Sequence, residues 1–245
     1  MSRVLIPLPD RGFDPTEAAV PWRALVQAGH GVVFATERGG SAPAADPVAL
    51  GGIVFGRFGA APEAKALYRE LEAAPGFSRP IAWAAIEPEA FDGLVLPGGH
   101  APGMRQYLGS EALQAKVVEF AKLGRPLAAI CHGVLVAARA RDAETGQSVL
   151  HARRTTCLPK WMERSAWAMT AWKLGRYYRT YDAYVEDEVK AALASPAQFA
   201  RGPFDLARGT DADDRPAFVV EDGAYVSARW PGDAYAFARA LLAKL

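Results

Sequence analysis

Apolar positions along this chain follow two alternating patterns, one typical of buried strands and one typical of helices. Short apolar runs, which suit strands buried on both faces, occupy residues 3–8, 31–36, 91–96 and 127–130. Stretches with helical periodicity occupy residues 16–28, 62–74, 111–123 and 132–141. Strands that alternate with helices predict an α/β fold, a three-layer sandwich around a mostly parallel central sheet.

The pattern returns after residue 216 with two further strands, at 217–220 and 225–228. Asp222 and Gly223 between them predict a hairpin turn, and a last helix is expected at 233–244. The whole chain, residues 1–245, is therefore expected to form a single domain of flavodoxin-like layout. Residues 9–15 and 39–52 are expected to be loops.

Residues 151–201 break this alternation and are rich in aromatic side chains. The aromatic residues are Trp161, Trp167, Trp172, Tyr177, Tyr178, Tyr181 and Tyr184. We expect an inserted helical or irregular segment that caps the functional site or forms an interface.

Composition and charge narrow the class of protein. Of the 245 residues 51% are hydrophobic and 22% charged, which is typical of a globular protein, and the net charge of +1 argues against nucleic acid or an anionic membrane as main partner. No apolar run approaches the roughly 20 residues of a membrane helix, and the start does not resemble a signal peptide. The two cysteines, Cys131 and Cys157, form no disulfide framework, so a cytoplasmic location is expected.

Cys131 is the leading candidate for chemistry. It stands between the strand at 127–130 and the helix that follows, where a sharp bend exposes a side chain at the carboxyl end of the sheet. The N–H groups of the helix start favour a thiolate there. This is the layout of a nucleophile elbow, although Ala129 stands where the strict pattern has glycine. The competing interpretation is a small buried core residue.

Other polar and glycine residues surround this bend in the sequence. His132 follows Cys131 directly and can form a Cys/His pair with it. Oxyanion or substrate-binding groups are expected from the turn after the preceding strand and from the elbow itself: Gly98, Gly99, His100 and Gly133. Glu17 lies at the start of the first helix, at the same edge of the sheet, where it can act as general acid or base or simply favour the helix start.

Together these motifs resemble the DJ-1/PfpI superfamily, within the class I glutamine amidotransferase-like fold, and most closely its Hsp31-like branch. The resemblance rests on Glu17-Ala-Ala-Val-Pro21, on the run from Phe91 to Pro97-Gly98-Gly99-His100, and on Ala128-Ala-Ile-Cys131-His132-Gly133. It implies a Cys131 nucleophile, a His132 base and a functional Glu17. It also implies an acidic residue that orients the histidine, for which Glu163 is the candidate and Asp182 and Glu186 are competitors.

The chain departs from the pattern of other branches at Cys157, where those branches place a histidine. A regulatory disulfide with Cys131 and a plain packing role are both open. The four histidines of the sequence show no metal-ligand spacing, so we expect no catalytic metal and no other cofactor.

The function that the resemblance implies is a glutathione-independent glyoxalase, which converts a 2-oxoaldehyde such as methylglyoxal and water to a 2-hydroxy acid, or a related deglycase or stress protein. The enzyme would be a lyase of glyoxalase III type, with a hydrolase as second choice. A cysteine peptidase or amidase of PfpI type, acting on a peptide-like substrate, is one alternative. A holding chaperone or redox sensor without catalysis is another. A homodimer is expected.

Overall fold

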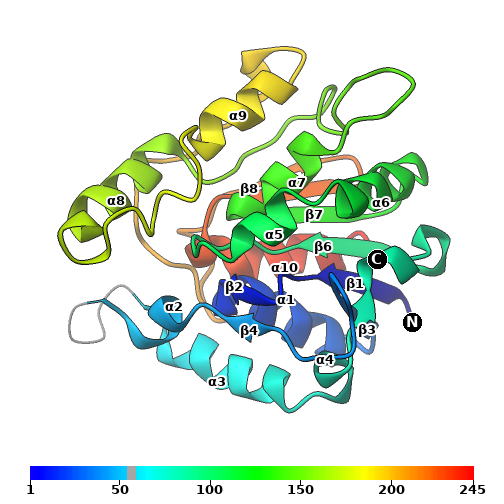
Figure 1. Cartoon of the computed structure of the whole chain (residues 1–245), viewed down its shortest axis with the longest axis horizontal. Coiled ribbons are helices and arrows are strands. Elements are labelled where there is room, and N and C mark those ends of the chain that lie inside the picture. The colour runs from blue at the N-terminus through cyan, green and yellow to red at the C-terminus, as the bar shows by residue number, and fades with distance from the viewer. Residues whose placement is uncertain (54–58) are drawn as a thin grey trace.

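A seven-stranded sheet runs through the molecule (Figure 1). The computed structural model describes residues 1–53 and 59–245. Neighbouring strands are parallel except the last pair, and the order is β5-β3-β1-β6-β7-β9-β8. The strands are β1 (Arg3–Pro7), β3 (Gly31–Thr36), β5 (Ile81–Ala82), β6 (Gly93–Leu96), β7 (Leu127–Ile130), β8 (Val219–Asp222) and β9 (Tyr225–Ala228).

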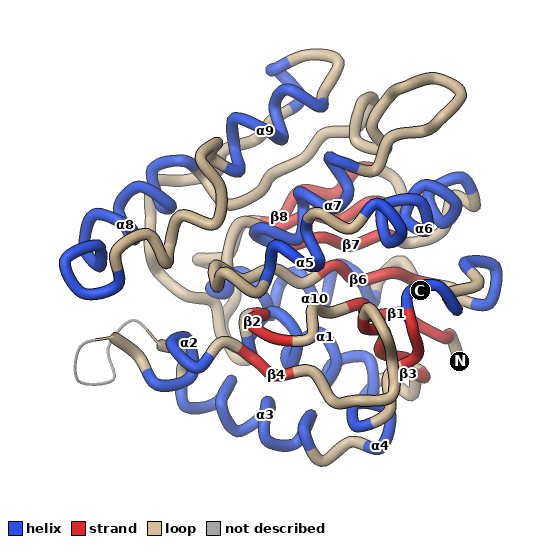
Figure 2. The backbone as a smooth tube through the Cα atoms, viewed as in Figure 1, coloured by secondary structure: helices blue, strands red, loops and turns tan. Residues whose placement is uncertain are grey.

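Helices cover both faces of this sheet (Figure 2), which confirms the predicted three-layer α/β fold. One layer holds α1 (Pro15–Gln27), α3 (Pro62–Glu72) and α10 (Ala234–Leu242), with α1 in contact with both others. The other layer holds α5 (Met104–Leu108), α6 (Glu111–Lys122) and α7 (Val134–Arg139). Short helices α2 (Pro47–Gly51) and α4 (Pro75–Ser78) lie in the connections. Among the helices of the described residues, none has the length and hydropathy needed to cross a bilayer.

The start of α1 places Glu17 at the carboxyl edge of the sheet. The Asp14 carboxylate accepts hydrogen bonds from the N–H groups of Thr16 (2.8 Å) and Glu17 (3.2 Å), and Pro15 occupies the first helical position. An aspartate cap followed by proline is a strong helix start, because the cap satisfies free N–H groups and proline has none to satisfy. The helix therefore begins one residue before the predicted position.

The predicted loops contain two short strands. β2 (Arg11–Phe13) and β4 (Ala44–Ala45) pair with each other in a small second sheet. Its position is supported by Tyr68, whose hydroxyl accepts a hydrogen bond from the Ala45 N–H at 3.0 Å. Strands of two or three residues are too short to show an alternating pattern, which is why the sequence did not predict them or β5.

The hairpin at the sheet edge is confirmed, but its turn lies at Gly223 and Ala224, one residue later than predicted, and its first strand is shifted. β8 ends at Asp222, which pairs with Tyr225, and Gly223 turns the chain with a φ of +61°. The predicted strand at 217–220 therefore lies two residues too early. The ladder with β9, which extends to the turn, determines the observed bounds.

The aromatic-rich segment contains two helices, α8 (Lys160–Leu174) and α9 (Val185–Ala192). In Figure 1 α8 lies at the upper left and α9 at the top of the view, and α9 contacts α7. A bridge between Thr155 and Phe199 closes the base of the segment. The expectation that this segment is helical or irregular agrees with these elements, and its role as a cap or interface stays a prediction.

A buried ion pair joins the last strand to the last helix. Arg229 and Asp233 are both fully buried, and two guanidinium nitrogens of Arg229 donate to the carboxylate at 2.9 and 2.8 Å. Asp233 also accepts from the N–H of Phe218 at 3.0 Å, while Arg229 donates to the carbonyl of Pro203 at 3.0 Å. The pair thus connects β9, α10 and the segment that leads into β8.

We expect Asp233→Asn to lower the free energy of unfolding by about 3–5 kcal/mol, because it leaves the Arg229 charge buried without a counterion. Urea unfolding followed by circular dichroism measures this. The matched control is Asp213→Asn, which removes an exposed pair with Arg215 (2.7 Å) and is expected to change the free energy of unfolding far less, because solvent screens this pair. Equal losses in the two variants would contradict the structural role of the buried pair.

Candidate active site

Cys131 lies in a sharp bend between strand and helix. β7 ends at Ile130, a single helical turn follows at Cys131–Gly133, and α7 begins at Val134. Cys131 has a φ of +58° and is the single non-glycine residue with positive φ in the described parts of the chain. Such a conformation is strained for a residue with a Cβ atom and is typical of a nucleophile held in an elbow.

Two glycines allow the neighbouring strand ends to approach this bend. A Cβ atom on Gly133 would lie 2.1 Å from the carbonyl oxygen of Leu96 at the end of β6. A Cβ atom on Gly98 would lie 2.7 Å from the backbone nitrogen of His132 and 2.8 Å from a carboxylate oxygen of Glu17. Both distances are too short for a side chain, so glycine is required where the two turns meet.

The thiol and the imidazole of the adjacent residues are in contact. Cys131 Sγ lies 3.5 Å from His132 Nδ1, and both side chains are buried. Burial lowers the pKa of His132 well below its ordinary value, and positive charge on His100 or Arg139 would lower it further. His132 is therefore a neutral imidazole that can accept a proton.

Glu17 is the third group at the elbow. One of its oxygens accepts a hydrogen bond from the Gly98 N–H at 2.7 Å, and its other oxygen is buried and has no hydrogen-bond partner among the described residues. Burial, together with the charge of Asp14, raises the Glu17 pKa well above its ordinary value. Burial and the charge that Glu17 would carry also raise the pKa of the Cys131 thiol. In this enclosed arrangement burial outweighs the helix start that was expected to favour a thiolate.

His100 extends the site beyond the elbow. Its ring lies edge-on to His132, with 4.7 Å between ring centroids, and 4.8 Å from the ring of Tyr178. Burial lowers its pKa to about 4, so this ring is also neutral. Donor atoms of His100, Cys131 and His132 lie within 4.8 Å of one another, so these three side chains could together hold a soft metal ion. The absence of a catalytic metal stays a prediction.

Thr180, which the sequence analysis missed, faces the other side of His132. Its hydroxyl lies 3.5 Å from His132 Nε2 and donates to the backbone oxygen of His100 at 2.9 Å. It comes from the chain between α8 and α9, so the aromatic-rich segment supplies a group to the site. No motif marks a lone threonine in such a segment, and only the folded chain brings it to His132.

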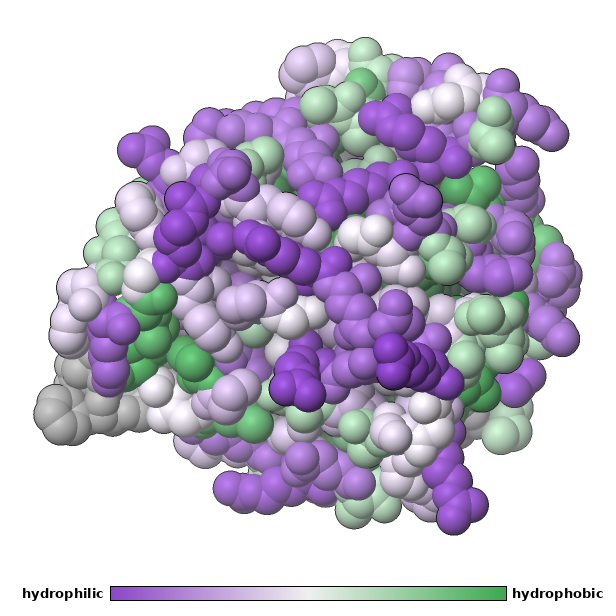
Figure 3. All heavy atoms as spheres, viewed as in Figure 1, coloured by the Kyte–Doolittle hydropathy of each residue, from purple (hydrophilic) through white to green (hydrophobic). Residues whose placement is uncertain are grey.

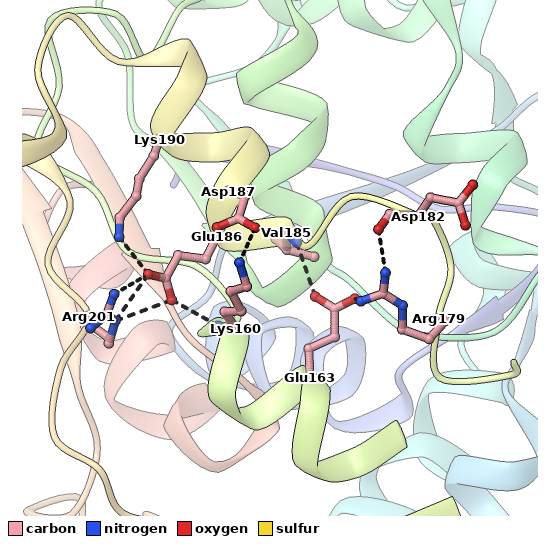
Figure 4. Close-up of polar contacts among 9 residues, drawn as sticks. All are labelled: Lys160, Glu163, Arg179, Asp182, Val185, Glu186, Asp187, Lys190 and Arg201. Atoms are coloured by element: carbon pink, nitrogen blue, oxygen red, sulfur yellow. Dashed lines mark hydrogen bonds and ion pairs between the residues drawn. The ribbon is translucent and has the colours of Figure 1, made fainter. Parts of the chain in front are cut away.

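The proposed acidic residues have partners elsewhere (Figure 4). Glu163 is buried and accepts from the Val185 N–H at 3.1 Å, and its other oxygen lies 3.8 Å from Arg179. Burial raises its pKa to about 7. The structure does not bring this carboxylate to His132, and the hydroxyl at Nε2 is that of Thr180.

The two competing acids are also engaged in ion pairs. Asp182 is exposed and pairs with Arg176. Glu186 is buried and accepts from Lys190 and Arg201, each at 2.6 Å. Although burial raises the pKa of Glu186, hydrogen bonds from these two cations lower it to about 2. These contacts stabilise the segment and leave Thr180 as the group beside His132.

Cys157 is a free, buried thiol, as is Cys131. Its sulfur donates to the carbonyl of Leu158 at 3.6 Å, and burial raises its pKa. These features suit the packing interpretation, and a link to Cys131 under oxidation stays a prediction.

The arrangement can carry out nucleophilic chemistry on a carbonyl carbon. It offers a strained thiol, a neutral base at 3.5 Å and a carboxyl that holds or gives up a proton in the same buried space. The backbone N–H of His132 belongs to the Cys131–Gly133 turn, where an oxyanion would form.

Known proteins share both the sequence pattern and the fold. The family model described as ThiJ/PfpI family-like matches residues 8–203. A deglycase of Pyrococcus abyssi is 28% identical over 239 residues, which cover 97% of this chain and 95% of the deglycase. An uncharacterized protein of Schizosaccharomyces pombe is 29% identical over 187 residues, which cover 73% of this chain and 67% of the relative.

Two solved structures illustrate the shared fold. Glyoxalase III from Candida albicans superimposes with a TM-score of 0.68 at 17% identity, covering 100% of this chain and 97% of its own. The rapid encystment protein of Francisella tularensis gives a TM-score of 0.72 at 16% identity, covering 100% and 99%. Because the family model spans most of the chain, including the elbow, the glycine turn and Glu17, the chain belongs to the ThiJ/PfpI family of the DJ-1/PfpI superfamily.

Proposed function

We propose that this protein is a cysteine-dependent glyoxalase that converts a 2-oxoaldehyde and water to a 2-hydroxy acid without glutathione. The observation that carries the proposal is the meeting of Cys131, His132 and Glu17 in one buried space. The strained elbow, the 3.5 Å contact between thiol and imidazole, and the raised pKa of Glu17 support it. The fold shared with glyoxalase III and the matching deglycase favour it further.

The reaction would begin with the thiol. Cys131 loses its proton to His132 or Glu17 and attacks the aldehyde carbon, giving a hemithioacetal. The N–H groups of Gly99 and His132 would stabilise the oxyanion, and loss of one such donor typically costs about 3–4 kcal/mol. Glu17 is the group placed to move the proton from the former aldehyde carbon to its neighbour through an enediol.

Water would complete the cycle. The proton transfer leaves a thioester on Cys131, and hydrolysis releases the 2-hydroxy acid and restores the thiol. The oxidation of one carbon is balanced by the reduction of the next, so the step consumes water and no external oxidant.

Deglycase activity is a second candidate, because the matching relative of Pyrococcus abyssi bears that name. The same nucleophile would then attack the carbon of an adduct between an aldehyde and an amine or thiol. A glyoxalase acts only on the free aldehyde, so it cannot remove the adduct faster than the adduct dissociates spontaneously. A rate of adduct loss above that limit, measured with a methylglyoxal adduct of N-acetylarginine, would favour the deglycase.

We expect purified protein to form lactate from millimolar methylglyoxal, and Cys131→Ser to lower kcat at least about a thousandfold, because serine is a poorer nucleophile here. Enzymatic lactate determination measures this. Cys157→Ala is the control and should stay within about twofold of the original. Absence of lactate with the unaltered protein, or equal activity in Cys131→Ser, would overturn the proposal.

Glu17→Gln should have opposite effects on catalysis and on thiol reactivity. We expect kcat to fall about 10²–10⁴-fold with loss of the proton carrier. We expect the pH profile of Cys131 alkylation by iodoacetamide to move to lower pH, because the neutral amide removes a negative charge that raises the thiol pKa.

Mass spectrometry separates Cys131 from Cys157, whose alkylation is the internal control. Unchanged lactate formation would assign proton transfer to another group. A profile moved to higher pH would mean that Glu17 stabilises the thiolate.

Thr180 is expected to act as a positioning residue for His132. Thr180→Val should lower kcat about two- to tenfold, the usual range for one lost hydrogen bond, and Thr180→Ser should restore it. Glu163→Gln should leave kcat within about twofold. A larger loss in Glu163→Gln than in Thr180→Val would return the supporting role to the acidic residue.

A further inference from the structure

A cavity of about 380 Å³ opens next to the elbow. Gly99 and His100 form part of its wall, and His100 stands between the cavity and His132, in contact with both His132 and Tyr178. Cavities of this size suit ligands of about drug size, so methylglyoxal would leave most of it empty.

The wall is mainly apolar and formed in large part by α8. Figure 3 shows apolar surface, in green, at the left of the view beside the grey residues, where Figure 1 places α8 above α2. The apolar residues that line the cavity include Leu158, Met162, Ala166, Met169, Leu206 and Trp230. Such a wall stabilises an apolar group by about 25 cal/mol for each Å² that it removes from water.

The charged side chains of the cavity wall already make contacts within the protein. The Asp14 carboxylate caps α1, and Asp46 accepts from the Val48 N–H (2.8 Å) and the Tyr177 hydroxyl (2.5 Å). The Arg208 guanidinium lies over the ring of Trp230 at 4.8 Å. The wall carries two carboxylates and one guanidinium, which disfavours an anionic ligand. Both carboxylates already accept hydrogen bonds at helix starts, so they bind a cationic ligand only weakly.

Three hydrogen-bond groups of the wall lack partners within the described residues. They are the hydroxyl of Thr16, the indole N–H of Trp230 and Nε2 of His100. Thr16 is 4% exposed, so its hydroxyl is costly to leave unsatisfied. A ligand with a carbonyl oxygen and an apolar body would satisfy such groups while filling the cavity.

We propose that this cavity binds the uncharged apolar substituent of the substrate, so that the protein prefers 2-oxoaldehydes with an aryl or branched alkyl group over methylglyoxal. This inference rests on the proposed function for its reaction and on the cavity for its specificity. Because Cys131 is fully buried, a side chain has to move to admit the carbonyl group, and we infer that it is His100, which lines the cavity and contacts His132. The unpartnered Nε2 of His100 means that rotation of this side chain breaks no hydrogen bond at that atom.

Two alanines of α8 provide a matched pair of variants. Ala166 lines the cavity, whereas Ala168 is exposed on the same helix and does not line it. Ala166→Trp fills the cavity, and Ala168→Trp adds the same ring outside it. Ala168 lies outside the cavity, so Ala168→Trp should leave methylglyoxal turnover within about twofold of that of the unaltered protein.

The first measurement is binding of acetophenone, a neutral aryl ketone, by saturation-transfer NMR. We expect the unaltered protein and Ala168→Trp to bind it, and Ala166→Trp to bind at least about tenfold more weakly. Benzoate and benzylamine should bind at least about tenfold more weakly than acetophenone to the unaltered protein. Equal acetophenone binding by the two tryptophan variants, or tighter binding of a charged probe, would overturn the proposal.

The second measurement is the ratio of kcat/KM for phenylglyoxal to that for methylglyoxal. We expect at least about tenfold in the unaltered protein and in Ala168→Trp, and a ratio lowered at least about tenfold in Ala166→Trp. Comparison among variants cancels the difference in intrinsic reactivity of the two aldehydes. Acetophenone binding without turnover of either aldehyde would refute the glyoxalase function and this specificity with it. Methylglyoxal turnover without acetophenone binding would refute the specificity alone.

Discussion

The site depends on close contact between two adjacent backbone turns. The turn after β6 and the elbow after β7 approach so closely that Gly133 meets the carbonyl oxygens of Leu96 and Pro97, and Gly98 meets the His132 nitrogen. Parallel pairing of β6 and β7 brings the ends of both strands to the same edge, and α1 adds Glu17 there. The chemistry of Cys131 is therefore set by sheet register and by the two residues that lack side chains.

Burial is the main cause of the protonation states of His132 and Glu17. His132 is neutral because it is enclosed and because the group at its Nε2 is the hydroxyl of Thr180 and not a carboxylate. A hydroxyl can orient an imidazole but does little to stabilise an imidazolium. Glu17, with its raised pKa and its place beside the thiol, is thus the stronger candidate for carrying the proton through the reaction.

The sequence predicted the long strands of the central sheet, most of the helices that cover it, and the residues at the centre of the candidate site. Continuous apolar runs predicted the long strands, because burial on both faces leaves little freedom in residue type. The predicted proximity of Cys131, His132 and Glu17 agrees with the structure, since strand ends of a parallel sheet converge at one edge, and their catalytic roles stay predictions.

What the sequence did not predict was decided by tertiary contacts. Thr180 reaches His132 through an irregular segment, and β4 is held by contacts that include Tyr68, neither of which leaves a local pattern. Glu163 was chosen by its place after a proline, but its neighbours in space, Val185 and Arg179, take up its oxygens.

The left-handed backbone of Cys131, with a φ of +58°, has a consequence for how this chain would change under selection for robustness alone. A side chain in that conformation costs about 1–2 kcal/mol, which glycine does not incur. Glycine at position 131 would thus relieve the elbow while removing the thiol. A laboratory evolution experiment that rewarded heat resistance and ignored turnover would therefore be expected to replace this thiol with glycine and give a more stable protein.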